Sequence, residues 1–252
     1  MLQARAIPCL LLMNKGLVKT VKFKNPGYVG DPINAVKIYN EKEVDELIFL
    51  DITASQENRK PNFKAIYEIA TECFMPLCYG GGISTIEDMK QLFALGVEKV
   101  SINTGAIENP ALISGGAKLF GNQSIIVSID VKKDFWGNYR VYYKRRTRSI
   151  KKTLVEFAKE MEQHGAGELL VTSIDREGTW EGYDIDLIKS ISDAVKIPVI
   201  ANGGAGCIDH LADAVKKGGA SAVAIGSMIV YQKKGHGVLI NFPSRSELNK
   251  LF

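Results

Sequence analysis

The stretch YGGGISTIEDMKQLFALG at residues 79–96 recurs in altered form as ANGGAGCIDHLADAVKKG at residues 201–218, an offset of 122. Three further pairs of segments keep nearly the same spacing: DELIFLDI (45–52) with GELLVTSI (167–174), SINTGAI (101–107) with AIGSMIV (224–230), and IPCLL (7–11) with IVSID (126–130). Solenoid repeats would be shorter and more numerous. The chain is therefore predicted to consist of two similar halves, about 1–120 and 121–252.

Within each half, short apolar runs alternate with longer amphipathic runs. The expected strands cover residues 6–12, 46–52, 75–79, 99–103, 124–130, 168–174, 197–202 and 222–227. The expected helices cover residues 31–43, 62–74, 84–96, 109–120, 149–165, 184–196 and 207–219. Parallel strands need a crossover between them. Eight strands in 252 residues without a linker favour one domain, a closed (β/α)8 TIM barrel of the α/β class.

Cap signals place the starts of three helices. They are Asp31 before Pro32, Ser84 with Glu87 three residues later, and Asn109 before Pro110. A capping side chain accepts a bond from a backbone N–H of the first turn, and proline is favoured at the first helical position.

The composition is that of a globular protein, with 46% hydrophobic and 24% charged residues. The 32 lysines and arginines exceed the 28 acidic residues by only four, too few to indicate a nucleic-acid partner. The apolar run Ile7–Met13 is too short to span a bilayer. A cytoplasmic protein without membrane or nucleic-acid partners is expected.

Cysteine and histidine spacing favours no metal site. The four cysteines (Cys9, Cys73, Cys78, Cys207) lack CxxC spacing and lie in or beside apolar runs, so buried thiols are expected. The three histidines have no zinc-like spacing. Neither a metal nor another cofactor is predicted.

Glycines and small polar residues follow four of the expected strands. The sites are Gly80-Gly81-Gly82, Asn103-Thr104, Gly203-Gly204 and Gly226-Ser227. Absent side chains let anionic oxygens approach backbone N–H groups. The same glycines also suit tight turns with positive φ. Because the pattern occurs in both halves, we predict two phosphate sites and a ligand with a phosphate at each end.

Strand parity predicts which side chains point into the barrel. Ile126, Ser128 and Asp130 share a face, so Asp130 is expected at the catalytic end as a general acid or base. A strand-end aspartate that caps a neighbouring turn is the alternative. The repeat places Leu11 at the equivalent position, and leucine transfers no proton.

Four charged residues open strands at the opposite end of the barrel. They are Arg5, Glu46, Lys99 and Glu168. If they point inward, two cations and two anions ring the floor of the bore, where charges are costly unless paired. Such a ring is either a gate or a salt-bridge plug.

Seven segments follow one another along the chain: IPCL, VDELIFLDITAS (44–55), YGGGI, KVSINT, SIDVK (128–132), GAGELLVTSIDREGT (165–179) and NGGAG. Together they resemble the HisF family, the cyclase subunit of imidazole glycerol phosphate synthase. The resemblance implies a HisH-like glutaminase docked at the N-terminal barrel face. Ammonia would pass through the bore to a bisphosphorylated ribulosyl aminoimidazole-carboxamide, giving imidazole glycerol phosphate and an aminoimidazole carboxamide ribotide.

The resemblance also implies roles for individual residues. Asp130 matches one of two catalytic aspartates, Lys19 matches a substrate-loop lysine, and the four floor charges match an ammonia gate. The phosphate grips would be Gly81, Gly82, Asn103, Thr104, Gly203, Gly204, Gly226 and Ser227. Asp51, Thr172 and Ser173 lie at matching strand ends and are expected to line the site.

Two departures from the family pattern bear on the chemistry. Leu11 stands where the second catalytic aspartate is expected, and Glu177 replaces an aspartate in SIDREGT. Loss of one catalytic group commonly costs orders of magnitude in rate. The CLLL form resembles HisF-like paralogues of surface-polysaccharide gene clusters, which implies ammonia supply for acetamidino-sugar synthesis with a separate sugar amidotransferase. Ordinary cyclisation in histidine biosynthesis, or a sugar-phosphate isomerase of the HisA type, are the alternatives.

Overall fold

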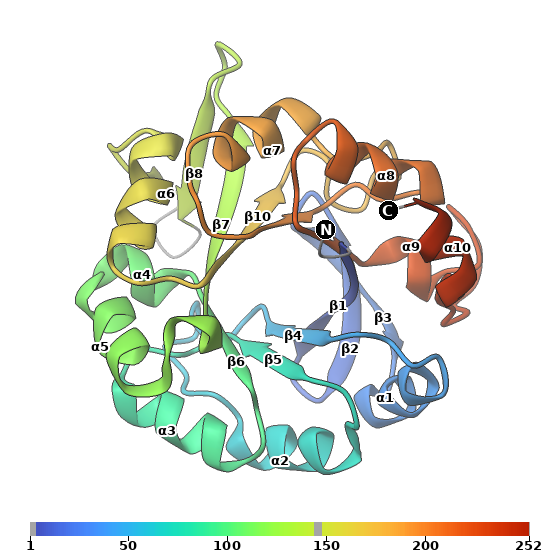
Figure 1. Cartoon of the computed structure of the whole chain (residues 1–252). Helices are drawn as coiled ribbons and strands as arrows, with labels where there is room; N and C mark the ends of the chain where they lie inside the picture. Colours follow the sequence, from blue (N-terminus) through green and yellow to red (C-terminus); the bar gives the residue numbers. More distant parts are fainter. Residues whose placement is uncertain (1–3, 144–147, 252) are drawn as a thin grey trace.

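A closed barrel of parallel strands forms the centre of the computed structural model, which describes residues 4–143 and 148–251. The ring order is β1-β4-β5-β6-β7-β10-β11-β12, closed by pairing of β10 with β7. These strands are Arg5–Met13, Leu47–Asp51, Leu77–Gly80, Lys99–Ile102, Ile125–Lys133, Glu168–Ser173, Val199–Asn202 and Ala222–Ile225. Figure 1 shows helices around the ring. The predicted (β/α)8 TIM barrel is confirmed.

Helices cover the outside of the barrel. They are α1 (Pro32–Glu41), α2 (Phe63–Glu72), α3 (Ile86–Ala94), α5 (Ala111–Phe120), α6 (Leu154–Gln163), α7 (Ile185–Ser192) and α8 (Ile208–Lys216). Asp31 caps α1 as expected, through the N–H of Asn34. The other two cap predictions were wrong: the capping box of α3 is Thr85 with Asp88, and α5 follows Pro110 without a side-chain cap.

Several elements were not expected from the sequence. Two antiparallel strands, β2 (Gly16–Val21) and β3 (Lys24–Gly30), follow β1, and β8 (Tyr139–Tyr143) and β9 (Arg148–Ser149) extend β7. The short helices α4 (Thr104–Glu108), α9 (Ser227–Val230) and α10 (Arg245–Leu251), and the 3-10 turn η1 (Asn122–Ser124), complete the fold. Most of these elements are short, so each offers too few residues for a periodic signal.

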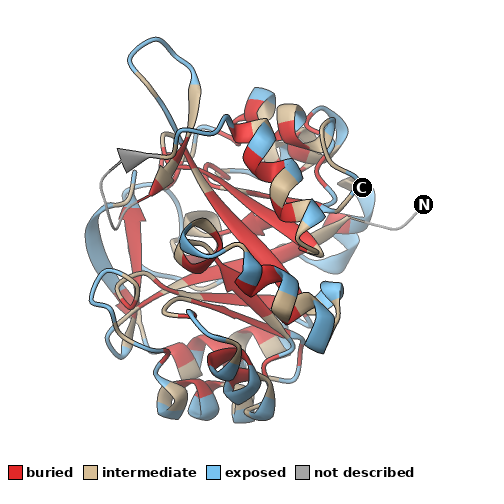
Figure 2. Ribbon diagram, turned by 90° about the vertical axis from the view of Figure 1, so that its left-hand side faces the viewer, coloured by how far each residue is buried: buried red, intermediate tan, exposed pale blue. Residues whose placement is uncertain are grey.

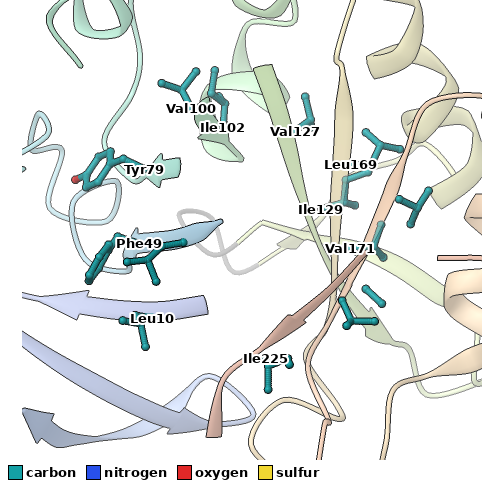
Figure 3. Packing of buried hydrophobic residues seen from close by; sticks show 14 of the residues in the cluster. Leu10, Phe49, Tyr79, Val100, Ile102, Val127, Ile129, Leu169, Val171 and Ile225 are labelled. Atoms are coloured by element: carbon teal, nitrogen blue, oxygen red, sulfur yellow. The ribbon is translucent and has the colours of Figure 1, made fainter. Parts of the chain in front are cut away.

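Two apolar clusters hold the barrel together. The outer cluster lies between strands and helices; Figure 3 labels Leu10, Phe49 and Leu169 among its members. The inner cluster fills the bore and contains Ile7, Cys9, Ile48, Cys78, Ile126, Leu170, Ile200, Ala222 and Ala224. Ile126, which parity placed on the inward face with Asp130, is one of its members. In Figure 2 the strands of the barrel are mostly buried, while the helices expose their outer faces.

Two further expectations concern the surface of the molecule. Cys9 and Cys78 are buried, but Cys73 is only partly buried and Cys207 is exposed, so the prediction of four buried thiols was wrong for these two. Cys207 opens α8 on the solvent side, where an apolar neighbour in the sequence does not ensure burial. None of the helices in the described ranges has the length and apolar composition needed to cross a bilayer.

Corresponding strands of the two halves lie opposite one another in the ring. Three strands lie between β1 and β7, between β5 and β11, and between β6 and β12, on either side of the eight-stranded ring. Features at the carboxyl ends of such a pair therefore face each other across the mouth of the barrel.

Candidate functional site

A pocket occupies the carboxyl-terminal mouth of the barrel. It has a volume of about 1320 Å³, including the space open to solvent. Its walls include most of the residues predicted from the sequence: Leu11, Lys19, Asp51, Gly81, Gly82, Asn103, Thr104, Asp130, Thr172, Glu177, Gly203, Gly204, Gly226 and Ser227. Ser173 is not among the lining residues; it is buried on the outward face of β10, beside the inward Thr172.

The two glycine pairs adopt the same unusual backbone in both halves. The φ angles are 115° and 73° at Gly81 and Gly82, and 88° and 119° at Gly203 and Gly204. A Cβ at Gly81 would lie 2.4 Å from the carbonyl oxygen of Asp51. The geometry is therefore compatible with both interpretations of these glycines. The tight turns require glycine at these positions, and the same turns line a pocket that an anionic ligand could enter.

Asn103 and Gly226 are the cap residues of α4 and α9, at equivalent points of the two halves. Asn103 Nδ2 donates to the Ser128 carbonyl oxygen at 2.9 Å and to Asp130 Oδ2 at 3.4 Å. Gly226 has no side chain, and the end of the Lys19 side chain occupies the space beside it. A Cβ added at Gly226 would lie 2.7 Å from Lys19 Nζ.

Lys19 brings a cation into the pocket. Its side chain is buried, and Nζ donates to the carbonyl oxygen of Cys9 at 2.7 Å. Burial lowers the pKa of Lys19, and the charge of Glu177 is among the effects that oppose the shift. An ammonium group that lines a pocket is a common partner of a phosphate.

Asp130 and Leu11 come from opposite strands, β7 and β1, and both line the pocket. Asp130 is partly buried beside Asn103. The position across from it presents an apolar side chain to the ligand space. Proton transfer from two sides of a bound molecule would need a polar group at both.

Asp51 lies at the edge of the pocket and is already engaged by the protein. Arg59 Nη1 contacts Oδ2 at 3.0 Å, and the N–H groups of Thr53 and Ala54 donate to Oδ1 at 3.1 and 3.0 Å. Asp51 therefore shapes its loop, and Arg59 is a residue that sequence reasoning missed. An arginine eight positions after a strand-end aspartate carries no periodic signal.

Glu177 is the second pocket carboxyl group with an unusual environment. It is 9% exposed, and burial raises its pKa while hydrogen bonds from Phe23 and Thr20 and the charge of Lys19 oppose the shift. Phe23 also lines the pocket.

Ser128 and Asn202, too, line the pocket and were absent from the predicted site. Asn202 Nδ2 donates to Thr172 Oγ1 at 3.0 Å. Both residues sit at inward positions near strand ends, so the parity that located Asp130 would have found them.

The four floor charges meet at the amino-terminal end of the bore. Arg5 pairs with Glu46 at 2.6 Å and with Glu168 at 3.0 Å, while Lys99 pairs with the same two carboxylates at 3.0 and 3.1 Å. Burial alone would lower the pKa of Arg5, but the charges and hydrogen bonds of Glu168 and Glu46 outweigh burial and raise this pKa. The ring alternates in sign and lies across the bore.

Comparison with known proteins places these features in a family. A family model described as "Histidine biosynthesis protein" matches residues 5–235. A Pseudomonas aeruginosa protein provisionally named imidazole glycerol phosphate synthase subunit hisF2 is 53% identical over 251 residues, covering 100% of this chain and 99% of that protein. The imidazole glycerol phosphate synthase subunit HisF of Alkaliphilus metalliredigens is 42% identical, covering 92% of each chain.

Both lines of comparison span the barrel, the floor ring and the mouth pocket together. The matched segment includes all four ring residues and every pocket residue described above. The chain belongs to the HisF family of histidine biosynthesis proteins.

Proposed function

We propose that this chain is the HisF-type subunit of a glutamine-dependent amidotransferase, which receives ammonia at the floor ring and releases it in the mouth pocket. A HisH-like glutaminase docked on the N-terminal face would supply the ammonia. The support is the arrangement along one axis: a charged ring, then an apolar bore, then a pocket.

The bore suits neutral ammonia better than ammonium. Its wall is made of aliphatic side chains and two thiols, and an unpaired charge there would be costly. Ser101 Oγ lies in the wall, buried and without a hydrogen-bond partner among the described residues. A small polar molecule in transit would satisfy this hydroxyl.

The ligand of the pocket would carry a phosphate at each end. The two glycine pairs belong to β5 and β11, which lie opposite one another, and Lys19 adds a cation beside Gly226. Backbone N–H groups near glycines and a lysine ammonium are both common phosphate partners.

Leu11 is the observation on which the choice of reaction rests. With Asp130 on one side and a leucine on the other, two-carboxylate cyclisation lacks one proton carrier. We therefore favour a paralogue that passes ammonia to acetamidino-sugar synthesis, with a separate sugar amidotransferase as the acceptor.

A turnover assay separates this role from cyclisation. Purified protein is given the bisphosphorylated ribulosyl aminoimidazole-carboxamide and free ammonium, beside the variants Leu11→Asp and Leu11→Asn. We expect negligible turnover by the wild type and by Leu11→Asn, and a gain of roughly a hundredfold in Leu11→Asp. The added Asp130→Asn change should abolish that gain. Rapid turnover by the unmodified protein would instead establish a cyclase.

Ordinary cyclisation is the second candidate, and Glu177 is the observation that favours it. This carboxyl group lines the same pocket as Asp130, and its pKa is raised by burial, as suits a proton donor. On this alternative, turnover is measurable in the wild type and is lost in both Glu177→Gln and Asp130→Asn.

The glutaminase partner is tested separately. A pull-down with the tagged chain should recover a glutaminase whose activity the chain stimulates. Lys99→Met and Glu46→Gln should reduce ammonia transfer while free ammonium is still used. Unchanged ammonia transfer from the glutaminase in both variants would contradict the role of the four floor charges as a gate.

A further inference from the structure

A β-hairpin covers part of the pocket mouth. Its strands β2 and β3 pair antiparallel, and β2 continues the sheet from the end of β1, with Val18 opposite Leu11. Lys19, Thr20 and Phe23 of this hairpin line the pocket. Residues 16–30 are called the lid hairpin below.

The turn of the lid hairpin is strained. Lys22 and Phe23 in the turn have φ angles of 53° and 60°, and Asn25 near the start of β3 has a φ of 51°. Left-handed backbone costs roughly 1–2 kcal/mol at each residue with a Cβ. Strain of this kind persists only where surrounding contacts hold it.

Glu177 supplies those contacts from the loop that follows β10. Its Oε1 accepts from Thr20 Oγ1 at 2.8 Å, and its Oε2 accepts from the backbone N–H of Phe23 at 3.0 Å. Its carbonyl oxygen accepts from the N–H of Lys22 at 3.0 Å. Glu177 therefore forms hydrogen bonds with strand β2, through Thr20, and with the strained turn, through Lys22 and Phe23.

The neighbouring backbone is shaped for the same approach. Gly178 has a φ of 72°, and a Cβ there would lie 2.4 Å from the carbonyl oxygen of Thr20. The lid hairpin therefore rests directly on the loop that carries Glu177, with no room for a side chain between them.

We propose that Glu177 is a latch: its carboxylate holds the lid hairpin over the pocket, and breaking its two side-chain bonds opens the mouth. Glutamate reaches one methylene further than the aspartate expected at this point of the sequence, which lets one carboxylate reach Thr20 and Phe23 together. That the opened mouth admits a phosphorylated ligand rests on the proposed function; the latch itself does not.

Hydrogen exchange of the ligand-free chain tests the latch. Backbone amides of residues 17–29 are followed in the wild type and in Glu177→Ala and Glu177→Gln. In Glu177→Ala we expect Phe23 and Lys22 to exchange at least about tenfold faster, because both carboxylate bonds are gone. Glu177→Gln keeps one acceptor oxygen, so its exchange rates should lie between those of the wild type and those of Glu177→Ala.

Glu181→Ala is the matched control, since this exposed carboxylate lies on the same loop and pairs with Arg176 and not with the lid hairpin among the described residues. It should leave lid exchange unchanged, and amides of β10 should be unaffected in every variant. Acceleration throughout the barrel, or of Phe23 alone while Lys22 stays protected, would overturn the latch. Because no ligand or ammonia enters the assay, failure of the proposed function leaves its outcome intact.

Discussion

Asn103 and Gly226 occupy equivalent points of the two halves, but different side chains fill the space beside them. The side chain of Asn103 bonds Ser128 and Asp130, whereas the space beside Gly226 holds the ammonium group of Lys19. The two halves of the repeated scaffold therefore differ at these equivalent points. Only the second has Lys19 beside it.

Gly226→Ala should displace that cation without unfolding the protein. Asn103 adopts similar backbone angles, −108° and −77° against −114° and −93°, so alanine fits the backbone. Lys19 Nζ is the free end of a flexible chain and would move. We expect the affinity for inorganic phosphate, measured by calorimetry, to fall about tenfold.

Gly27→Ala is its control, because a Cβ there meets only one backbone atom, at 3.9 Å. Equal phosphate affinity in the two variants would show that Lys19 does not contribute to the grip.

At the scale of the element, helix α3 starts one residue later than the sequence pattern indicates. Thr85 Oγ1 accepts from the N–H of Asp88, whose carboxylate accepts from the N–H groups of Thr85 and Ser84. Thr85→Ala and Asp88→Asn should each lower the free energy of unfolding by about 1 kcal/mol in urea denaturation. Glu87→Gln should change it by no more than about 0.5 kcal/mol. A larger loss of stability in Glu87→Gln than in Thr85→Ala or Asp88→Asn would instead favour the cap predicted from the sequence, Ser84 with Glu87.

The contribution of Asp88 should depend on pH. Burial alone would raise its pKa, but hydrogen bonds from Ser84 and Thr85 and the charge of Lys60 outweigh it and lower the pKa below 3.8. A carboxyl group with a lowered folded pKa stabilises above its unfolded pKa and loses that effect as pH falls through the folded value. The stability gap between wild type and Asp88→Asn should be full at pH 7 and should close as pH falls through the lowered folded pKa of Asp88, below the ordinary range for an aspartate. A gap that persists in acid would contradict this origin.

At the scale of the whole molecule, the floor ring ties together strands far apart in the sequence. Lys99→Met leaves Glu46 and Glu168, whose side chains are 3% and 11% exposed, with Arg5 as their remaining cation in the ring. We expect a loss of about 2–4 kcal/mol in the free energy of unfolding. Lys189→Met, which breaks an exposed pair with Asp193, should cost less than about 0.5 kcal/mol. Similar losses in both would mean that the ring adds nothing to stability.

Most of the barrel was predictable because its signals are local. Alternation along 124–130 gave the inward face of Ile126 and Asp130, and the repeat paired each strand with its counterpart. The lid hairpin was not predictable, because its second strand, β3, is mostly exposed and its contacts reach Glu177, 154 residues beyond Phe23. Ser173 was misplaced because proximity to a strand end does not specify which side of the sheet it faces.

The sequence by itself determined the two-half plan, the family, the positions of the glycine turns and the presence of Leu11 at the position equivalent to Asp130. Each of these depends on residue type and spacing along the chain. Only the tertiary structure decided that Arg59 engages Asp51, that Lys19 fills the space beside Gly226, and that Glu177 bonds the lid hairpin. These contacts join side chains from different strand ends, and closure of the barrel brings those ends together.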